Sequence, residues 1–147
     1  MTRRHALLIA VPLSLSMVAG ACGDDDADEA EFSSPLGGTI WILDNESIDV
    51  EVPDGTEEVT IAFSTDGSFA GHVACNNYTG GYATADDGGI TASNVAVTEQ
   101  ACEPDVMAVQ TTYLSDLGLV AEFEIDGDEL RLKAADGAEL LRYDRDE

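Results

Sequence analysis

The sequence predicts an α+β fold, in which one amphipathic helix lies on a curled, barrel-like antiparallel sheet of about seven to eight strands. Three observations predict it. Apolar and polar residues alternate with a period of two through most of the chain after residue 36, as in half-buried strands. Asp-Gly pairs, which favour tight turns, recur between these segments. One stretch, residues 104–117, follows a helical period instead.

The first strands are expected near the start of this region. Residues 39–43 begin a strand, and the alternation of aliphatic and acidic residues over 48–52 indicates another. Residues 59–63 alternate in the same way. A turn signal at 65–68 then returns the chain along 69–73, so these segments predict a hairpin.

Residues 76–82 are expected to form a turn, because asparagine and glycine tolerate a left-handed backbone there. The next strand is expected over 90–97. Residues 123–125 and 130–132 predict a hairpin, and 139–143 the last strand. The Asp-Gly turns begin at Asp54, Asp66, Asp87, Asp126 and Asp136.

The helix is expected from Pro104 to a C-terminal cap at Gly118. Proline suits the first helical turn, and Asp105 suits the positive end of the helix dipole. Glycine suits the position just after a helix ends. The apolar positions repeat at helical spacing: Val106, Met107, Val109, Tyr113, Leu114 and Leu117.

Residues 1–21 have the pattern of an export signal of the lipoprotein type. Arginines at 3 and 4 precede an apolar run that is too short to span a bilayer. Small residues then lead directly to Cys22, which resembles a bacterial lipobox. That resemblance implies cleavage before Cys22 and a lipid anchor (palmitate) on it, facing outside the cytoplasm. An ordinary signal peptide, cut near Ala21, is the alternative.

Residues 22–35 predict a disordered acidic tether, and residues 36–147 predict one globular domain. The acidic run lacks the spacing of ligands and glycine that a calcium loop needs. After Cys22 there are thirty acids and four bases, a formal charge of about −26. Such a charge disfavours nucleic acid as a partner and favours solubility.

The three cysteines divide into one for lipid and two for a bridge. The lipoprotein interpretation of Cys22 is preferred because a third cysteine otherwise has no partner in an exported chain. If Cys75 pairs with Cys102, the bridge closes a loop of 27 residues and ties the sheet to the segment before the helix. An oxidising compartment follows.

Three groups of spaced residues carry a resemblance to a known family. Residues 36–43 read Leu-Gly-Gly-Thr-Ile-Trp-Ile-Leu, and a middle and a second-cysteine group follow: Phe63, Gly67, Gly71, Cys75, Asn76, Tyr78, Gly80 and Tyr82, then Thr98 and Cys102. Together they resemble the META domain (HslJ-like) lipoproteins over residues 36–143. Ala74 departs from the pattern, since the family usually has glycine there. The resemblance implies a disulfide-linked cell-envelope domain, associated in some members with stress, antibiotic tolerance, motility or virulence, and no known reaction or cofactor.

Catalytic residues are scarce. His72 is the one histidine of the exported chain, and Ser64 or Ser68 would be the nucleophile of a triad. One histidine and two bridged cysteines do not make a zinc site without carboxylates. No spacing among the acids selects a pair for glycoside cleavage.

Tyr78 and Tyr82 are the candidates for a recognition surface, together with Asn76 and Asn77. The alternatives are that Tyr82 packs on the disulfide and that the two asparagines cap the turn. Trp41, at strand spacing, is expected in the core. We expect a non-enzymatic, lipid-anchored envelope protein, whose domain binds an unknown envelope protein or component, in a stress-related role. The alternative is a small exported hydrolase that uses carboxylates or His72. A third hypothesis, calcium-dependent folding, predicts a melting temperature that rises with calcium.

Overall fold

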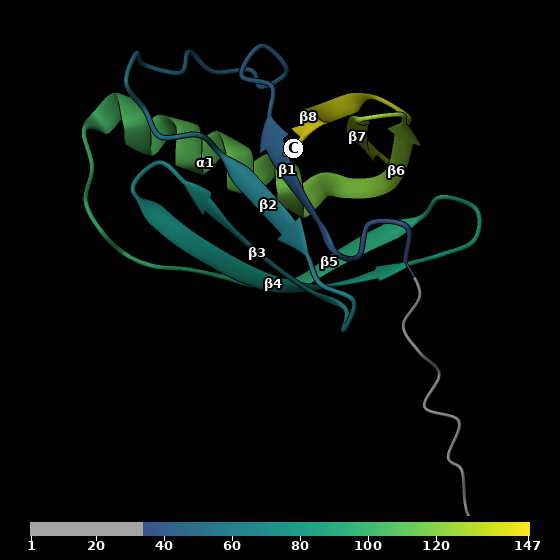
Figure 1. The fold of residues 1–147 in the computed structure, drawn as a ribbon. Helices are drawn as coiled ribbons and strands as arrows, with labels where there is room; N and C mark the ends of the chain where they lie inside the picture. Colours follow the sequence, from purple (N-terminus) through teal and green to yellow (C-terminus); the bar gives the residue numbers. More distant parts are fainter. Residues whose placement is uncertain (1–33) are drawn as a thin grey trace, which may run out of the picture.

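The strands of the domain form one antiparallel sheet. The structure is a computed structural model that describes residues 34–147. Figure 1 shows the elements in chain order: β1 (Thr39–Leu43), β2 (Thr60–Phe63), β3 (Ser68–Val73), β4 (Asn76–Thr84), β5 (Ile90–Val97), α1 (Pro104–Leu119), β6 (Val120–Asp126), β7 (Glu129–Ala134) and β8 (Glu139–Arg145). The order across the sheet is β5-β4-β3-β2-β1-β8-β7-β6.

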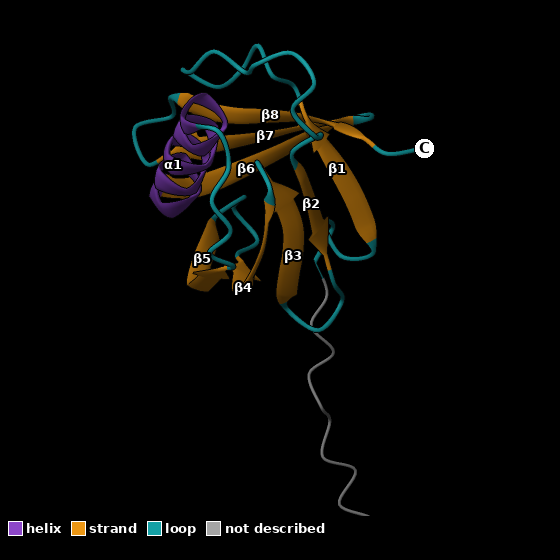
Figure 2. Ribbon diagram, turned by 90° about the vertical axis from the view of Figure 1, so that its left-hand side faces the viewer, coloured by secondary structure: helices purple, strands orange, loops and turns teal. Residues whose placement is uncertain are grey.

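The sheet curls until its two edge strands meet at one end. There an antiparallel bridge joins Gly89, just before β5, to Glu122 of β6, and Phe123 N donates a hydrogen bond to Gly88 O beside it. Helix α1 lies along the open side (Figure 2). The predicted fold class, a curled antiparallel sheet with one helix, is therefore confirmed.

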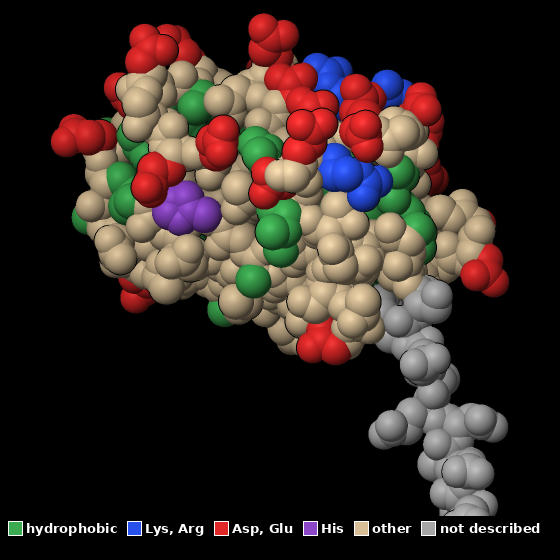
Figure 3. All heavy atoms as spheres, viewed as in Figure 1, with side chains coloured by type: hydrophobic (Ala, Val, Ile, Leu, Met, Phe, Trp, Pro, Cys, Tyr) green, Lys and Arg blue, Asp and Glu red, His purple; other side chains and the backbone are tan. Residues whose placement is uncertain are grey.

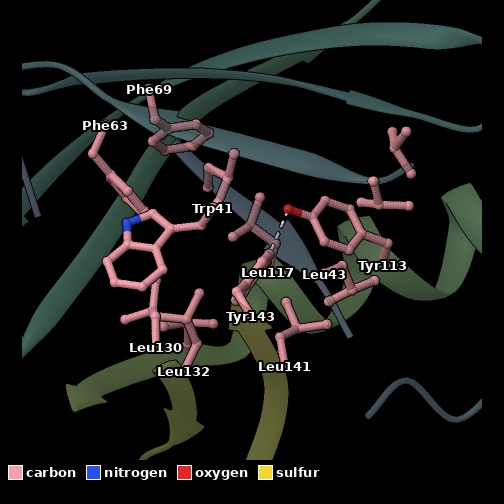
Figure 4. Close-up of a cluster of buried hydrophobic side chains, with 14 of the residues drawn as sticks. Trp41, Leu43, Phe63, Phe69, Tyr113, Leu117, Leu130, Leu132, Leu141 and Tyr143 are labelled. Carbon is pink, nitrogen blue, oxygen red and sulfur yellow. Dashed lines mark hydrogen bonds between the residues drawn. The ribbon is translucent and has the colours of Figure 1, made fainter. Parts of the chain in front are cut away.

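The core fills the space between the sheet and the helix. Trp41 is fully buried, as expected, and it lies beside Leu130 and Leu132 of β7 (Figure 4). Helix α1 directs Val109, Tyr113 and Leu117 into the same cluster. Period-two alternation places one face of each strand in this core, which is why the sequence pattern predicts the strands well.

The five Asp-Gly turns form as predicted. Each of their glycines has a positive φ, between 63° and 88°, which a residue without Cβ adopts at little cost. In three of them the aspartate side chain accepts a hydrogen bond from the backbone N–H two residues on: Asp66, Asp87 and Asp136.

Three predicted elements are wrong. Residues 48–52 form no strand. Ile48 is buried, and Val50 and Val52 pack on the core from a long loop, so the alternation of apolar and acidic residues there reflects which side chains are buried and not a strand. The expected turn over 76–82 is part of β4, and the chain reverses earlier, at Ala74 with a φ of 59°. Gly118 lies inside α1, which ends at Leu119 and leads directly into β6.

Candidate functional site

A disulfide joins the start of β4 to the segment before α1. Cys75 and Cys102 are bonded, with their Cα atoms 6.1 Å apart and a sequence separation of 27. Cys75 is half-buried and directly follows the left-handed residue Ala74. The bridge holds the loop between β5 and α1 against the turn between β3 and β4.

Asn76 supports the disulfide from within. Its side chain is fully buried, and every hydrogen-bonding position is used. The Nδ2 group donates to Gln100 O at 3.0 Å and to Gln110 Oε1 at 2.8 Å. The Oδ1 atom accepts from Thr98 Oγ1 at 2.8 Å and from Gln100 N at 2.7 Å. One amide therefore connects β4, the loop after β5 and helix α1.

A chain of tyrosine hydroxyls crosses the core. Tyr78 donates to Thr60 O at 2.7 Å, and because a carbonyl only accepts, Tyr113 must donate to Tyr78, at 2.6 Å. Tyr143 then donates to Tyr113 at 2.9 Å (Figure 4). Burial raises the pKa of all three hydroxyls well above the ordinary value of 10.0. They remain neutral and tie β4, α1 and β8 together.

The predicted recognition surface is not a surface. Tyr78 is 1% and Tyr82 5% exposed, and Asn76 is fully buried, because β4 directs these three side chains into the core. Tyr82 packs edge-on against Phe63 and donates to Ser64 O. Of the four candidates only Asn77 is exposed. Asn76, Tyr78 and Tyr82 therefore contribute to packing inside the domain.

His72 lies on the outer face of β3, away from Phe69 and Val73. Its Nε2 atom is 2.8 Å from Glu57 Oε2 and 2.9 Å from Ala74 O. Both partners are acceptors, so Nε2 carries the proton. Neither candidate serine contacts the ring; Ser68 Oγ donates to Asp66 instead. Among residues 34–147 the triad of the hydrolase alternative is therefore not assembled, and no cluster of metal-ligating side chains occurs.

Comparison with known proteins identifies the family of the chain. A family model for the META domain matches residues 34–147. The chain belongs to the META domain family. Two solution NMR structures have a similar fold: one from Burkholderia xenovorans, at 21% identity, 99% of each chain and a TM-score of 0.62, and one at 22% identity, 74% of this chain, 90% of the other and a TM-score of 0.56. No curated protein matches this chain.

Two of the glycines that carried the META resemblance, Gly71 and Gly80, serve close packing. A Cβ on Gly71 would lie 2.0 Å from Thr60 O and 2.5 Å from the Tyr78 hydroxyl oxygen, so only glycine leaves room for that hydrogen bond. A Cβ on Gly80 would lie 2.4 Å from the Phe69 ring. These META positions therefore build the inside of the domain.

Sequence reasoning missed one contributor to this region, Gln110, which is the polar residue on the buried face of α1. Thr98, which belongs to the second-cysteine group of the resemblance, completes the amide network. A glutamine at helical spacing between Val106 and Tyr113 was the available signal. The predicted export signal, Cys22 and nearly all of the tether lie outside the described residues. No helix within residues 34–147 is long and apolar enough to cross a membrane.

Proposed function

We propose that this META domain protein is a cell-envelope lipoprotein, anchored through lipid on Cys22 and acting as a non-enzymatic, stress-related binding module. The observation that carries the proposal is the Cys75–Cys102 disulfide. It occupies two of the three cysteines and suits an oxidising compartment, which leaves Cys22 directly after the small residues of the signal.

Metabolic labelling tests the anchor. Cells that express the chain are grown with an alkyne analogue of palmitate, and the purified protein is coupled to a fluorophore. We expect the wild type to be labelled and to fractionate with membranes until detergent is added. Cys22→Ser should lose both properties, while Cys75→Ala with Cys102→Ala should keep the label. An unlabelled, detergent-independent wild type would contradict the proposed anchor.

The hydrolase alternative rests on the pair formed by His72 and Glu57, since an imidazole beside a carboxylate can serve as a general base. The binding proposal expects no turnover of chromogenic esters, amides or glycosides by the purified chain. If turnover is found and His72→Ala abolishes it while the melting temperature is unchanged, the enzymatic alternative replaces the proposal. His72→Gln is the matched control: it keeps a polar side chain at this position but cannot act as a general base, so it should also lose any turnover that depends on the imidazole.

A further inference from the structure

The two edges of the sheet differ in charge. Strand β6 carries three acids along its length: Glu122, Glu124 and Asp126. Such charges are a common way to prevent edge strands from pairing with other chains. Strand β5, at the other edge, has none, and residues 88–98 contain no charged residue in a chain with thirty acids. Val95 on this strand is 42% exposed.

The backbone of β5 presents unpaired groups outward. Tyr82 pairs with Ala92, but the Tyr82 N–H bonds Gly67 O on the far side of β4, so the N–H and C=O of Ala92 point away from β4. Thr98 N bonds Asn77 O, so the groups of the preceding residue, Val97, also point to the open edge. Strand β6 lies beside the start of β5, where Ile90 and Thr91 line a hollow with Val120 and Ala121, so the open part of the edge is the stretch that leads to Val97.

Two features shape this edge. A register shift at residues 79–81, with Asn94 at a φ of 52°, bends β5 but leaves the outward groups of Ala92 and Val97 in place. Helix α1 supplies a wall, since a shallow hollow is lined by Val97, Thr98, Met107 and Gln110. We use the name edge groove for residues 90–98 together with this hollow, which borders the Val97 end of the strand and the Met107 face of α1.

Acids stand at both ends of the edge groove. Asp86 and Asp87 precede β5, Glu99 follows it, and all three are exposed. None is compensated within residues 34–147, because the four bases there lie on β7 and β8 and pair with other acids. Figure 3 shows these bases gathered at one end of the molecule, beside acidic side chains.

We infer that β5 binds an extended peptide segment of a partner protein, which adds a strand to the sheet and carries Lys or Arg on both sides of an uncharged, β-branched centre. A second copy fits poorly, because antiparallel pairing of two β5 strands would bring Asp86 and Asp87 of one copy to Glu99 of the other. The acidic tether fits poorly for the same reason. The inference rests on the proposed binding function and names its partner class.

Fluorescence anisotropy with the full chain in a non-ionic detergent tests the inference. The probe is the labelled peptide Lys-Lys-Thr-Val-Thr-Val-Thr-Lys-Lys, and matched probes carry glutamate at the ends or proline at the centre. Each matched probe should bind about tenfold more weakly or worse, as expected for the loss of one charge-assisted or backbone interaction. Binding of the lysine probe should weaken with salt. No binding, or equal binding of the three probes, would overturn the inference.

Variants locate the groove. Ala92→Pro removes an outward N–H that β4 does not use, so the domain should fold and lose binding. Ser93→Lys, on an exposed side chain of β5, should repel the probe, whereas Ser93→Glu should strengthen binding. Ala135→Lys, equally exposed on the β7–β8 turn, is the charge control and should change little. If Ala92→Pro does not fold, the Ser93 pair decides; equal affinities of the two would overturn the inference.

Two further outcomes are distinguishable. A dimer in light scattering that Ser93→Glu dissociates would assign the edge to a second copy and overturn the inference. Cys22→Ser should bind the peptide as well as the wild type, since the groove does not involve the anchor. A lipid-labelled protein that does not bind the peptide would thus reject the edge groove and leave the proposed anchor intact. An unlabelled protein that binds the peptide would reject the anchor and support the edge groove.

Discussion

Residues 60–110, which form β2 to β5 and the first turns of α1, contain no Lys or Arg, whereas residues 120–145, which form β6 to β8, contain four. The first region, the bridged half, holds the disulfide and the two buried polar side chains of the described chain, Asn76 and Gln110. The second, the ion-paired half, has exposed or half-buried salt bridges on its outer face. Exposed ion pairs contribute little to the free energy of unfolding, while buried hydrogen-bonded amides and disulfides contribute more. The bridged half should therefore dominate the free energy of unfolding.

The largest effect is expected from the disulfide. Cys75→Ala with Cys102→Ala should lower the free energy of unfolding by about 3–4 kcal/mol, the chain-entropy value for a loop of this length. Urea denaturation followed by far-UV circular dichroism measures it, and a reducing agent should reproduce it in the wild type only. Lys133→Met, which breaks an ion pair with Glu124, is the control from the other half. If the control costs as much as the double variant, the comparison between the halves fails.

Asn76→Ala should have the next largest effect. Removal of the amide leaves the buried Gln110 Oε1 and the partly buried Gln100 N without their partners, and such groups left unpaired cost about 2–3 kcal/mol here. Urea denaturation again measures it. Asn77→Ala, one residue along and exposed, should change the free energy of unfolding far less. Similar losses at the two positions would show that the buried network does not hold this half.

The tyrosine hydroxyl chain joins the two halves, and high pH should break it. Burial raises the pKa of Tyr113 and Tyr143 in the folded state above 10.0, so the unfolded chain loses these protons first. Their stability contribution is complete below about pH 10 and is lost as the pH rises beyond it. Absorbance at 295 nm should therefore show these tyrosines ionising together with unfolding. Tyr113→Phe should cost about 1–2 kcal/mol at pH 7. Ionisation well before unfolding would contradict the burial.

The sequence predicted the ion-paired half more accurately than the bridged half. Strands β7 and β8 are joined by an Asp-Gly turn with simple alternation, so local chemistry defines them. In the bridged half, glycines and asparagines were interpreted as a turn by their backbone freedom. In fact Gly71 and Gly80 leave space for Tyr78 and Phe69 across neighbouring strands. That use of glycine depends on a contact between strands, which no local pattern contains.

Candidate site residues show the same limit. The pairing of Cys75 with Cys102 was predictable from three cysteines, of which one was assigned to lipid. The burial of Tyr78 and Tyr82 was not, because a strand's inward face is set by the register of its neighbours. The uncharged edge of β5 was present in the sequence throughout, but its meaning required the strand order.

A small gain is expected at the turn of the bridged half. Ala74 has a φ of 59°, a conformation that costs L-residues free energy and that glycine adopts freely. Ala74→Gly should therefore raise the free energy of unfolding by about 0.5–1 kcal/mol, after the entropy of the more flexible unfolded chain is subtracted. Thermal unfolding measures it. Ala70→Gly, on the exposed face of β3, should lower stability instead; a loss at both positions would reject the strained turn.

The smallest effect is expected at Asp44 on the edge of the ion-paired half, and it should depend on pH. A hydrogen bond from Arg142 holds the pKa of Asp44 below its ordinary value of 3.8. A depressed pKa stabilises the folded state above the unfolded value and loses that contribution as the pH falls through the folded one. The stability difference between wild type and Asp44→Asn should therefore be present at pH 6 and shrink below about pH 4. High salt should reduce it as well, because the pair is partly exposed. Asparagine also accepts the hydrogen bond that Asp44 receives from Glu46 N, so Asp44→Asn removes the charge and keeps this backbone contact. A difference that persists at pH 2 would therefore show that the effect does not come from the ion pair, and would remove the ion pair from the comparison.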